Sequence, residues 1–328
     1  MAGLRPLAAL LAVSAALWAG PAPAAQAASA RDAQAPRVVV SIKPLHGLVA
    51  GVMAGLGAPV LLVGGGASPH DYGLRPSEAR ALSEAEVIFW VGGGLETFLE
   101  KPLRALAGRA RVVEISREPG VTRLPVRRGG TWKAHAGRDD AGQHGDGRRE
   151  AHDRAAFNPH VWLDPANAGR IVEIAVAVLG EVDPGRAAAY AENGARLSAR
   201  LAALDRRLRR RLAPVKAVPY VVLHDAYAYF ERRYGLNVVG AFSVNPAVPP
   251  GARRRVALRR RIVERGAACV FSEPQFKPAL LEAAIRGTVA KSGVLDPLGA
   301  ALAPGPEAYF TLMHRLAGAL VACLGAAR

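Results

Sequence analysis

Three histidines occupy similar places in the chain and could together bind a metal ion. His70 lies in a Ser-Pro-His-Asp segment, His160 lies in Asn-Pro-His-Val, and His224 follows an apolar run that ends at Leu223. Each lies at or near the end of a segment that we expect to be a strand. Ligands of α/β sheets gather beyond the carboxyl ends of strands, and neutral imidazole is the commonest metal ligand. The pattern therefore indicates a metal site assembled from distant parts of the chain.

Each of these histidines also has an acidic residue close by in the sequence, at Asp71, Asp164 and Asp225. A carboxylate there could accept a hydrogen bond from the ring nitrogen that does not bind metal. Each histidine taken alone can equally be structural, in a turn or in the core. No H-E-x-x-H or other local metal motif is present, so the residues alone leave both interpretations open.

The elements that would position these histidines alternate between short apolar strands and longer helices. We expect strands at 37–42, 59–63, 86–91, 111–115, 220–223, 237–242, 268–272 and 292–295. We expect helices at 45–56, 77–83, 95–107, 167–179, 186–212, 226–234, 250–265, 278–287 and 307–324, with Ser77 as the N-cap of the second. This order predicts an α/β fold of two lobes with mostly parallel sheets, joined by one long helix, with metal in the cleft between them.

The predicted domains follow from this rhythm. The N-terminal lobe spans 36–165, a helical linker that contains the long helix spans 166–213, and the C-terminal lobe spans 214–328. Residues 124–157 interrupt the first lobe with a polar stretch that lacks apolar periodicity. We interpret it as a flexible loop that contains His and Asp residues.

The first thirty residues have the layout of a secretory signal peptide. Arg5 precedes an apolar run from Pro6 to Trp18, which is followed by small-residue A-x-A patterns. The run is shorter than the roughly 20 residues of a membrane span, and the leader has no Cys for a lipid anchor. We expect no later membrane span. The sequence therefore predicts a signal peptide at 1–30 and a mature protein in the periplasm.

The chain is basic, with 43 Lys and Arg against 27 Asp and Glu and a formal net charge of +16. Such a balance can indicate nucleic acid or a membrane surface. The densest Arg run, at 206–211, falls at the end of the expected long helix, where positive charge is favourable. Because the chain also carries an export signal, we expect a solvated basic surface and no nucleic-acid partner.

Two cysteines, Cys269 and Cys323, are present. An even count in an oxidising compartment indicates one disulfide, although two free buried thiols are the alternative. The chain has no C-x-x-C pair that would indicate a cysteine zinc site.

Seven segments resemble the zinc-binding component of bacterial ABC uptake systems. This is the ZnuA type within the cluster A-I, or cluster 9, periplasmic metal-binding proteins. The matching segments are 41–45, 69–77, 158–165, 223–230, 242–246, 271–276 and 295–299. The resemblance runs from about residue 37 to the C-terminus, and the segments together are very specific.

The resemblance implies the site and its role. His70, His160 and His224 match the metal-ligating histidines, and Asp296 matches an aspartate that ligates or neighbours the metal in relatives. The two cysteines match the disulfide of zinc-type members, and the long helix matches a rigid backbone between the lobes. The family does no catalysis, because its members capture Zn²⁺ and present it to a membrane permease. We further expect a monomer, with a periplasmic metallochaperone as another partner.

Two departures from the family pattern bear on the ligand set. Pro69 stands where some zinc-type members have a carboxylate, so the fourth ligand would be Asp296 or water. The 124–157 segment is a thin version of the family's His-rich loop, and its three histidines could form an auxiliary metal site or simply be solvated. They are His135, His144 and His152. Glu273 is interpreted as structural or as a support for a ligand.

Several alternatives differ in the metal or in the class of protein. Three imidazoles with one oxygen suit four-coordinate zinc, whereas manganese prefers more oxygen ligands. A manganese or iron member of the same family is the first alternative. A secreted metal-dependent hydrolase, a surface adhesin and a nucleic-acid-binding protein are the others. Histidine ligation predicts that metal affinity falls as the pH drops towards about 6, since the rings must be neutral.

Overall fold

The computed structural model describes residues 35–127, 157–243, 251–275, 282 and 285–326. By their contacts, residues 35–328 form one compact unit. The predicted signal peptide at 1–30 lies outside the described residues, as do most of the 124–157 segment and its three histidines. Most of the expected helix at 278–287 lies outside them as well.

The first half of this unit contains a parallel four-stranded sheet in the order β2-β1-β3-β4. Its strands are β1 Val38–Ile42, β2 Val60–Val63, β3 Val87–Trp90 and β4 Arg111–Glu114. Both central strands, β1 and β3, are buried along their whole length. Their continuous runs of Val, Ile and Phe are typical of a parallel sheet covered on both faces.

The second half repeats this arrangement in the order β6-β5-β7-β8, again with all strands parallel. Its strands are β5 Tyr220–His224, β6 Val238–Ser243, β7 Cys269–Ser272 and β8 Lys291–Val294. The expected α/β class and its two parallel sheets are confirmed.

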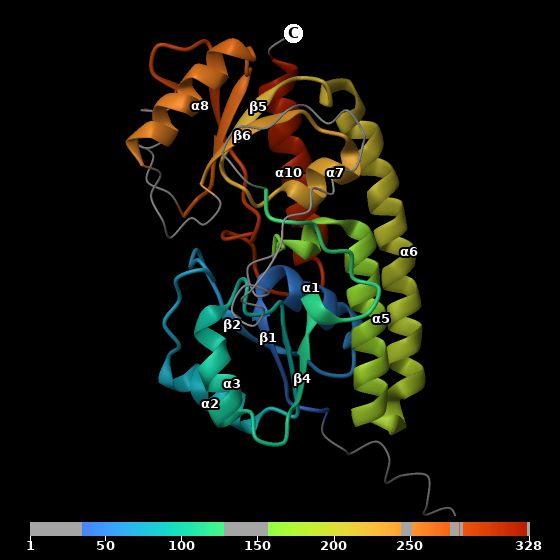
Figure 1. Cartoon of the computed structure of the whole chain (residues 1–328). Helices are drawn as coiled ribbons and strands as arrows, with labels where there is room; N and C mark the ends of the chain where they lie inside the picture. Colours follow the sequence, from blue (N-terminus) through green and yellow to red (C-terminus); the bar gives the residue numbers. More distant parts are fainter. Residues whose placement is uncertain (1–34, 128–156, 244–250, 276–281, 283–284, 327–328) are drawn as a thin grey trace, which may run out of the picture. The chain divides into compact units, whose positions relative to one another are not determined.

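Helices connect and cover the strands (Figure 1). The α-helices are α1 Lys43–Val52, α2 Pro76–Glu84, α3 Glu100–Leu106, α5 Pro165–Val182, α6 Ala187–Leu212, α7 Ala228–Tyr234, α8 Ala252–Glu264 and α10 Ala308–Gly325. Short 3₁₀ turns are η1 Thr97–Leu99, η2 Ile115–Arg117, η4 Val161–Leu163, η5 Pro184–Arg186 and η6 Ala213–Val215.

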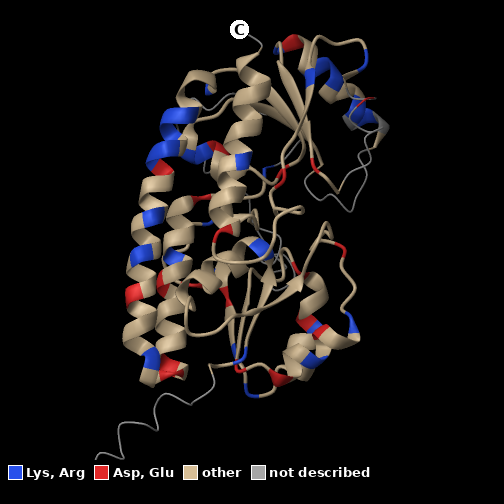
Figure 2. Cartoon of the chain, turned by 180° about the vertical axis from the view of Figure 1, so that it is seen from behind, with Lys and Arg blue, Asp and Glu red and all other residues tan. Residues whose placement is uncertain are grey.

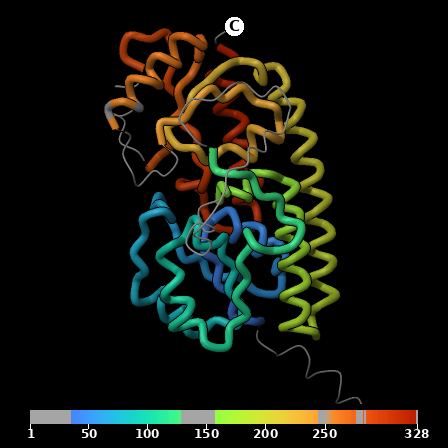
Figure 3. Tube along the Cα trace, in the orientation of Figure 1, coloured from blue at the N-terminus to red at the C-terminus, as the bar shows by residue number. Residues whose placement is uncertain are grey.

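The predicted long helix is α6, which runs antiparallel to α5 beside both sheets (Figures 1 and 3). It has 26 residues, and about 1.5 Å of rise per residue makes it roughly 39 Å long. A buried stripe of Leu and Tyr along it faces the core. The two helices approach closely at Gly194, where a Cβ would clash with the side chain of Val176. The last turn of α6 contains Arg209, Arg210 and Arg211, where positive charge is favourable. Figure 2 shows Lys and Arg gathered at the upper end of this helix.

One apolar core extends through both sheets and includes α1, α5, α6 and α10. A second, smaller cluster fills the far face of the second sheet, where Leu258 and Ile262 of α8 pack on Val221, Val239 and neighbouring apolar residues. The predicted division at 36–165, 166–213 and 214–328 stays a prediction, because a shared core joins the two halves.

The start of α2 differs from the prediction. The N-cap is Arg75, with Pro76 in the first turn, and the expected N-cap Ser77 lies inside the helix. The Arg75 backbone N–H donates to the Glu78 carboxylate at 2.8 Å. Proline has no N–H to satisfy and its fixed φ suits the first helical position, so the helix begins one residue before Ser77.

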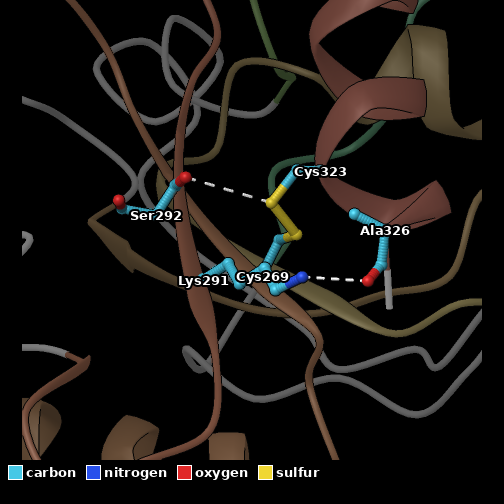
Figure 4. Close-up of a disulfide and its surroundings, with 5 residues drawn as sticks. All are labelled: Cys269, Lys291, Ser292, Cys323 and Ala326. Carbon is cyan, nitrogen blue, oxygen red and sulfur yellow. Dashed lines mark hydrogen bonds between the residues drawn. A yellow bond between two sulfur atoms is a disulfide. The ribbon is translucent and has the colours of Figure 1, made fainter. Parts of the chain in front are cut away.

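Cys269 and Cys323 form a disulfide across a sequence separation of 54 residues (Figure 4). The bond joins β7 to the last turns of α10. Beside it, the Lys291 ammonium donates to the Ala326 carbonyl at 2.9 Å. The predicted disulfide is therefore present, and it ties the C-terminal helix to the second sheet.

The expectation that no later stretch could span a membrane needs a correction. Among the described residues α10 is long and apolar enough by length and composition, with a mean hydropathy of 1.3. Half of it is buried, and it contacts α1, α6 and β8. The apolar side chains that give α10 its hydropathy therefore build the core of this unit.

Candidate metal site

His70, His160 and His224 converge on one point of the structure. Their ring centroids lie 4.8 to 5.5 Å apart, and one ligating atom from each lies within 4.8 Å of the others. His70 lies in the loop after β2, His160 directly precedes η4, and His224 is the last residue of β5. The structure thus brings together three residues that are 154 positions apart at most.

The orientation of His160 is fixed by Asn158. The Asn158 Oδ1 accepts from the His160 backbone N–H at 3.1 Å and lies 2.8 Å from the ring Nδ1. The Asn158 Nδ2 donates to the Asp225 carbonyl at 2.7 Å, which settles which end of the amide is oxygen. Nδ1 must therefore carry the proton, and Nε2 keeps its lone pair for a metal.

Glu273 fixes the orientation of His224 in the same way as Asn158 fixes that of His160. Its Oε1 lies 3.0 Å from the His224 Nδ1, and both side chains are buried. Because a carboxylate only accepts, the proton lies on Nδ1. The Nε2 of His224 and that of His70 are buried without a partner among the described residues. Such a carboxylate–histidine pair raises the basicity of the ligating nitrogen.

Burial keeps the rings of His70 and His160 neutral. It lowers the pKa of His70 to about 3, with a smaller contribution from the neighbouring His224 ring. It also lowers the pKa of His160 well below its ordinary value, helped by the two other histidines. Unprotonated imidazoles with free lone pairs are the state that a divalent metal requires.

The pocket around the rings is formed by the carboxyl ends of strands from both sheets. Besides the histidines it is lined by residues that follow β2, β3, β7 and β8, together with Trp162. These are Ser68, Pro69, Leu95, Glu273, Gln275, Pro297 and Leu298. The cavity is only about 10 Å³, the room of one water molecule or ion. A larger cavity, about 340 Å³ and lined by Trp90, Glu100 and Arg117 among others, includes none of the three histidines.

Asp296 does not join the three histidines in this arrangement. One of its carboxylate oxygens accepts from the backbone N–H groups of Leu298 and Gly299, and the other accepts from Ala300 at 2.6 Å. The Lys43 ammonium fixes the same turn by donating to the carbonyls of Gly299 and Ala300. Ligation by Asp296 stays a prediction, and here the carboxylate shapes the turn that carries Pro297 and Leu298 into the pocket wall.

The prediction that an acidic residue close in sequence accepts from each ring is wrong for His160 and His224. Asp164 instead accepts from the Ala166 N–H at the start of α5, and Asp225 pairs with Arg127. Asn158 and Glu273 take the places beside His160 and His224. Asn158 was missed, although it stands two residues before a histidine in one of the family-like segments. A residue next to a histidine in the sequence need not face the histidine ring, and Asp225 faces Arg127 instead. Glu273, which directly follows the neighbouring strand β7, does reach the ring of His224.

The fold and the site define a class of protein, an α/β binding protein in which two parallel sheets share one buried three-histidine pocket. Residues 38–323 match the family described as zinc-uptake complex component A, periplasmic (ZnuA), and the chain belongs to that family.

Comparison with individual relatives supports the same family assignment. The chain is 42% identical over 305 residues to the high-affinity zinc uptake system protein ZnuA of Brucella abortus, covering 88% of this chain and 91% of the relative. Among solved structures, a crystal structure of ZnuA superposes with a TM-score of 0.73 at 26% identity, covering 88% of this chain and 99% of that one. The periplasmic zinc-binding protein TroA of Treponema pallidum superposes at 0.71 with 25% identity, covering 88% and 99%.

Proposed function

We propose that this chain is the extracytoplasmic zinc-binding component of an ABC uptake system, which captures Zn²⁺ and delivers it to a membrane permease. The observation that carries the proposal is the convergence of His70, His160 and His224 around a cavity of about 10 Å³. Relatives named as high-affinity zinc uptake proteins share most of the chain.

Zinc fits this donor set better than manganese does. Three nitrogen donors, which leave one coordination position for a further donor, suit four-coordinate zinc. Glu273, in the pocket wall, is engaged with His224, and Asp296, next to the lining residue Pro297, accepts from backbone N–H groups. Manganese prefers a site richer in oxygen.

The size of the cavity speaks against the metal-dependent hydrolase. A catalytic zinc site needs space for an organic substrate beside the metal, and small-molecule pockets start at about 300 Å³. The histidine pocket offers about 10 Å³. A binding protein that encloses a single ion accounts for this geometry, and the family is one of solute-binding proteins.

The remaining parts of the proposal concern the place and partners of the protein. Residues 1–30 act as the signal peptide, the mature chain works as a monomer in the periplasm, and the permease receives the ion. The histidines of the 124–157 segment, His135, His144 and His152, form either a weak auxiliary metal site or part of a solvated segment, and a metallochaperone is a further partner. The family description as periplasmic supports the location.

Zinc titration of the purified chain and of two histidine variants tests the proposal. We expect one tight zinc per chain, and a loss of affinity of at least about 100-fold in His160→Ala, because one of three nitrogen donors is removed. His46→Ala is the matched control, since His46 is also buried but bonds the Pro59 carbonyl outside the site. Absence of tight zinc from the parent chain, or equal weakening in both variants, would overturn the zinc-capture function.

A further inference from the structure

The three histidines leave one position of a four-coordinate zinc open, and one polar side chain in the pocket wall has no partner. Gln275 lines the same cavity as the histidines and Glu273. Both of its amide atoms, Oε1 and Nε2, are buried without a hydrogen-bond partner among the described residues. Buried amides are normally hydrogen-bonded, so an amide left unpaired beside a metal pocket points to a ligand.

We propose that the amide oxygen of Gln275 is the fourth donor to the bound zinc. This inference rests on the proposed function and assigns the position that three imidazoles leave open. An amide oxygen is a hard, neutral donor that needs no deprotonation, so it adds no proton to the pH dependence of binding.

The surroundings of Gln275 favour this role over the acidic candidates. Glu273 stands two residues earlier, and its carboxylate is held by the Nδ1 of His224. That bond fixes the chain at the end of β7, from which Gln275 projects towards the pocket as part of its lining. Asp296 uses both oxygens for backbone N–H groups of its own turn. Of the oxygen-bearing side chains at this pocket, Gln275 is the one whose oxygen lacks a partner among the described residues.

The size of the cavity supports a direct contact. About 10 Å³ holds one ion or one water molecule and does not hold an ion with its own water. A zinc ion bound by the three histidines would therefore be enclosed by the pocket wall, to which Gln275 belongs.

The test compares zinc affinity and the visible spectrum of the Co²⁺-loaded chain for the parent, Gln275→Ala and Gln275→Glu. We expect Gln275→Ala to weaken zinc roughly 10- to 100-fold, and Gln275→Glu, which retains an oxygen donor, to bind at least as tightly as the parent. The Co²⁺ absorption band should differ between the parent and both variants, because the donor atom or its charge changes.

Asn237→Ala is the matched control. Asn237 also has a buried amide oxygen without a partner among the described residues, but its Nδ2 donates to the Ala217 carbonyl and it does not line the pocket. This variant should keep the zinc affinity and the Co²⁺ spectrum of the parent, whatever its effect on stability.

Parent-like zinc affinity and an unchanged Co²⁺ spectrum in Gln275→Ala would overturn this inference and leave the zinc-capture function standing. A zinc affinity of Gln275→Glu as low as that of Gln275→Ala would likewise overturn the inference, because Glu retains an oxygen donor. If the parent chain itself binds no zinc, the proposed function and this inference fall together. Thermal unfolding of the metal-free proteins separates a folding defect from lost ligation, and the Co²⁺ spectrum of Gln275→Glu decides the matter if Gln275→Ala does not fold.

Discussion

At the scale of single residues, the site depends on which nitrogen of each histidine is protonated. Asn158 and Glu273 accept at the Nδ1 atoms of His160 and His224, so that both Nε2 lone pairs are available to one ion. His70 completes the set with a buried Nε2 that has no partner among the described residues. With the pKa of His70 lowered to about 3 and that of His160 well below normal, these two rings are already neutral at pH 6. The loss of metal affinity expected from the sequence as the pH drops towards about 6 is therefore not expected from these two rings.

The depressed histidine pKa values predict that the metal-free protein loses stability in acid. The pKa of His70 is lowered to about 3 and that of His160 well below normal, in both cases chiefly by burial. In the unfolded chain these rings take up protons below a pH of about 6.5, which the folded protein does not, so the free energy of unfolding falls as the pH falls. From about pH 7.5 to about pH 5.5 the two rings together should cost about 2–3 kcal/mol.

Urea denaturation of the metal-free chain at several pH values measures this slope. His160→Gln removes one of these two groups and should make the slope shallower than that of the parent. A slope in His160→Gln as steep as in the parent would show that His160 does not titrate in this way.

At the scale of elements, a buried ion cluster fastens the segment before residue 128 to the second sheet. Arg127 pairs with Asp225, which follows β5, and with Glu231 of α7 at 2.7 Å. Tyr220 of β5 donates to the same Glu231, and burial raises the pKa of this carboxyl while Arg127 opposes the rise. The cluster lies directly beside the metal site, because Asp225 follows His224 and its carbonyl accepts from Asn158.

Replacing Arg127 by Met should destabilise the fold by about 3 kcal/mol, because it leaves two buried carboxylates without their cation. Arg75→Met is the matched control, since Arg75 is 72% exposed in its pair with Glu78 and should change stability by less than about 1 kcal/mol. Chemical denaturation of both variants measures the difference. Equal losses in the two would mean that the buried cluster contributes no more than a surface pair.

At the scale of the whole molecule, the two halves share one core, and covalent and helical links hold it together. The helix α10 packs on α1 from the first half and on β8 from the second, and the disulfide fastens its last turns to β7. The helix α6 runs beside both halves, with α5 packed against it (Figure 3).

Removal of the disulfide by Cys269→Ala with Cys323→Ala should lower the stability of the fold by about 2–4 kcal/mol. The bond closes a loop of 54 residues, and a cross-link of that length restricts the unfolded chain. Thermal unfolding of the double variant against the parent measures the loss, and zinc titration should show an unchanged site, because neither cysteine lines the pocket. An unaltered unfolding temperature would show that packing alone fixes α10.

The sequence by itself determined the α/β class, the order of strands and helices, the long helix and the three histidines. These follow from local patterns: apolar runs of strand length, the stripe of Leu along 187–212, and motifs that extend over a few residues. The exact start of α2 did not follow from the local pattern, because the first-turn preference of Pro76 overrode the capping preference of Ser77.

Only the tertiary structure decided which groups surround the histidines. Glu273 reaches His224 across parallel strands, and Asp296 turns its oxygens to its own backbone. Asp225 turns away to Arg127, and Gln275 is left unpaired in the pocket wall. Contacts between strand ends depend on strand order and on the direction of each side chain. Neither is encoded by the spacing of residues along the chain, because parallel strands bring together segments that are far apart in sequence.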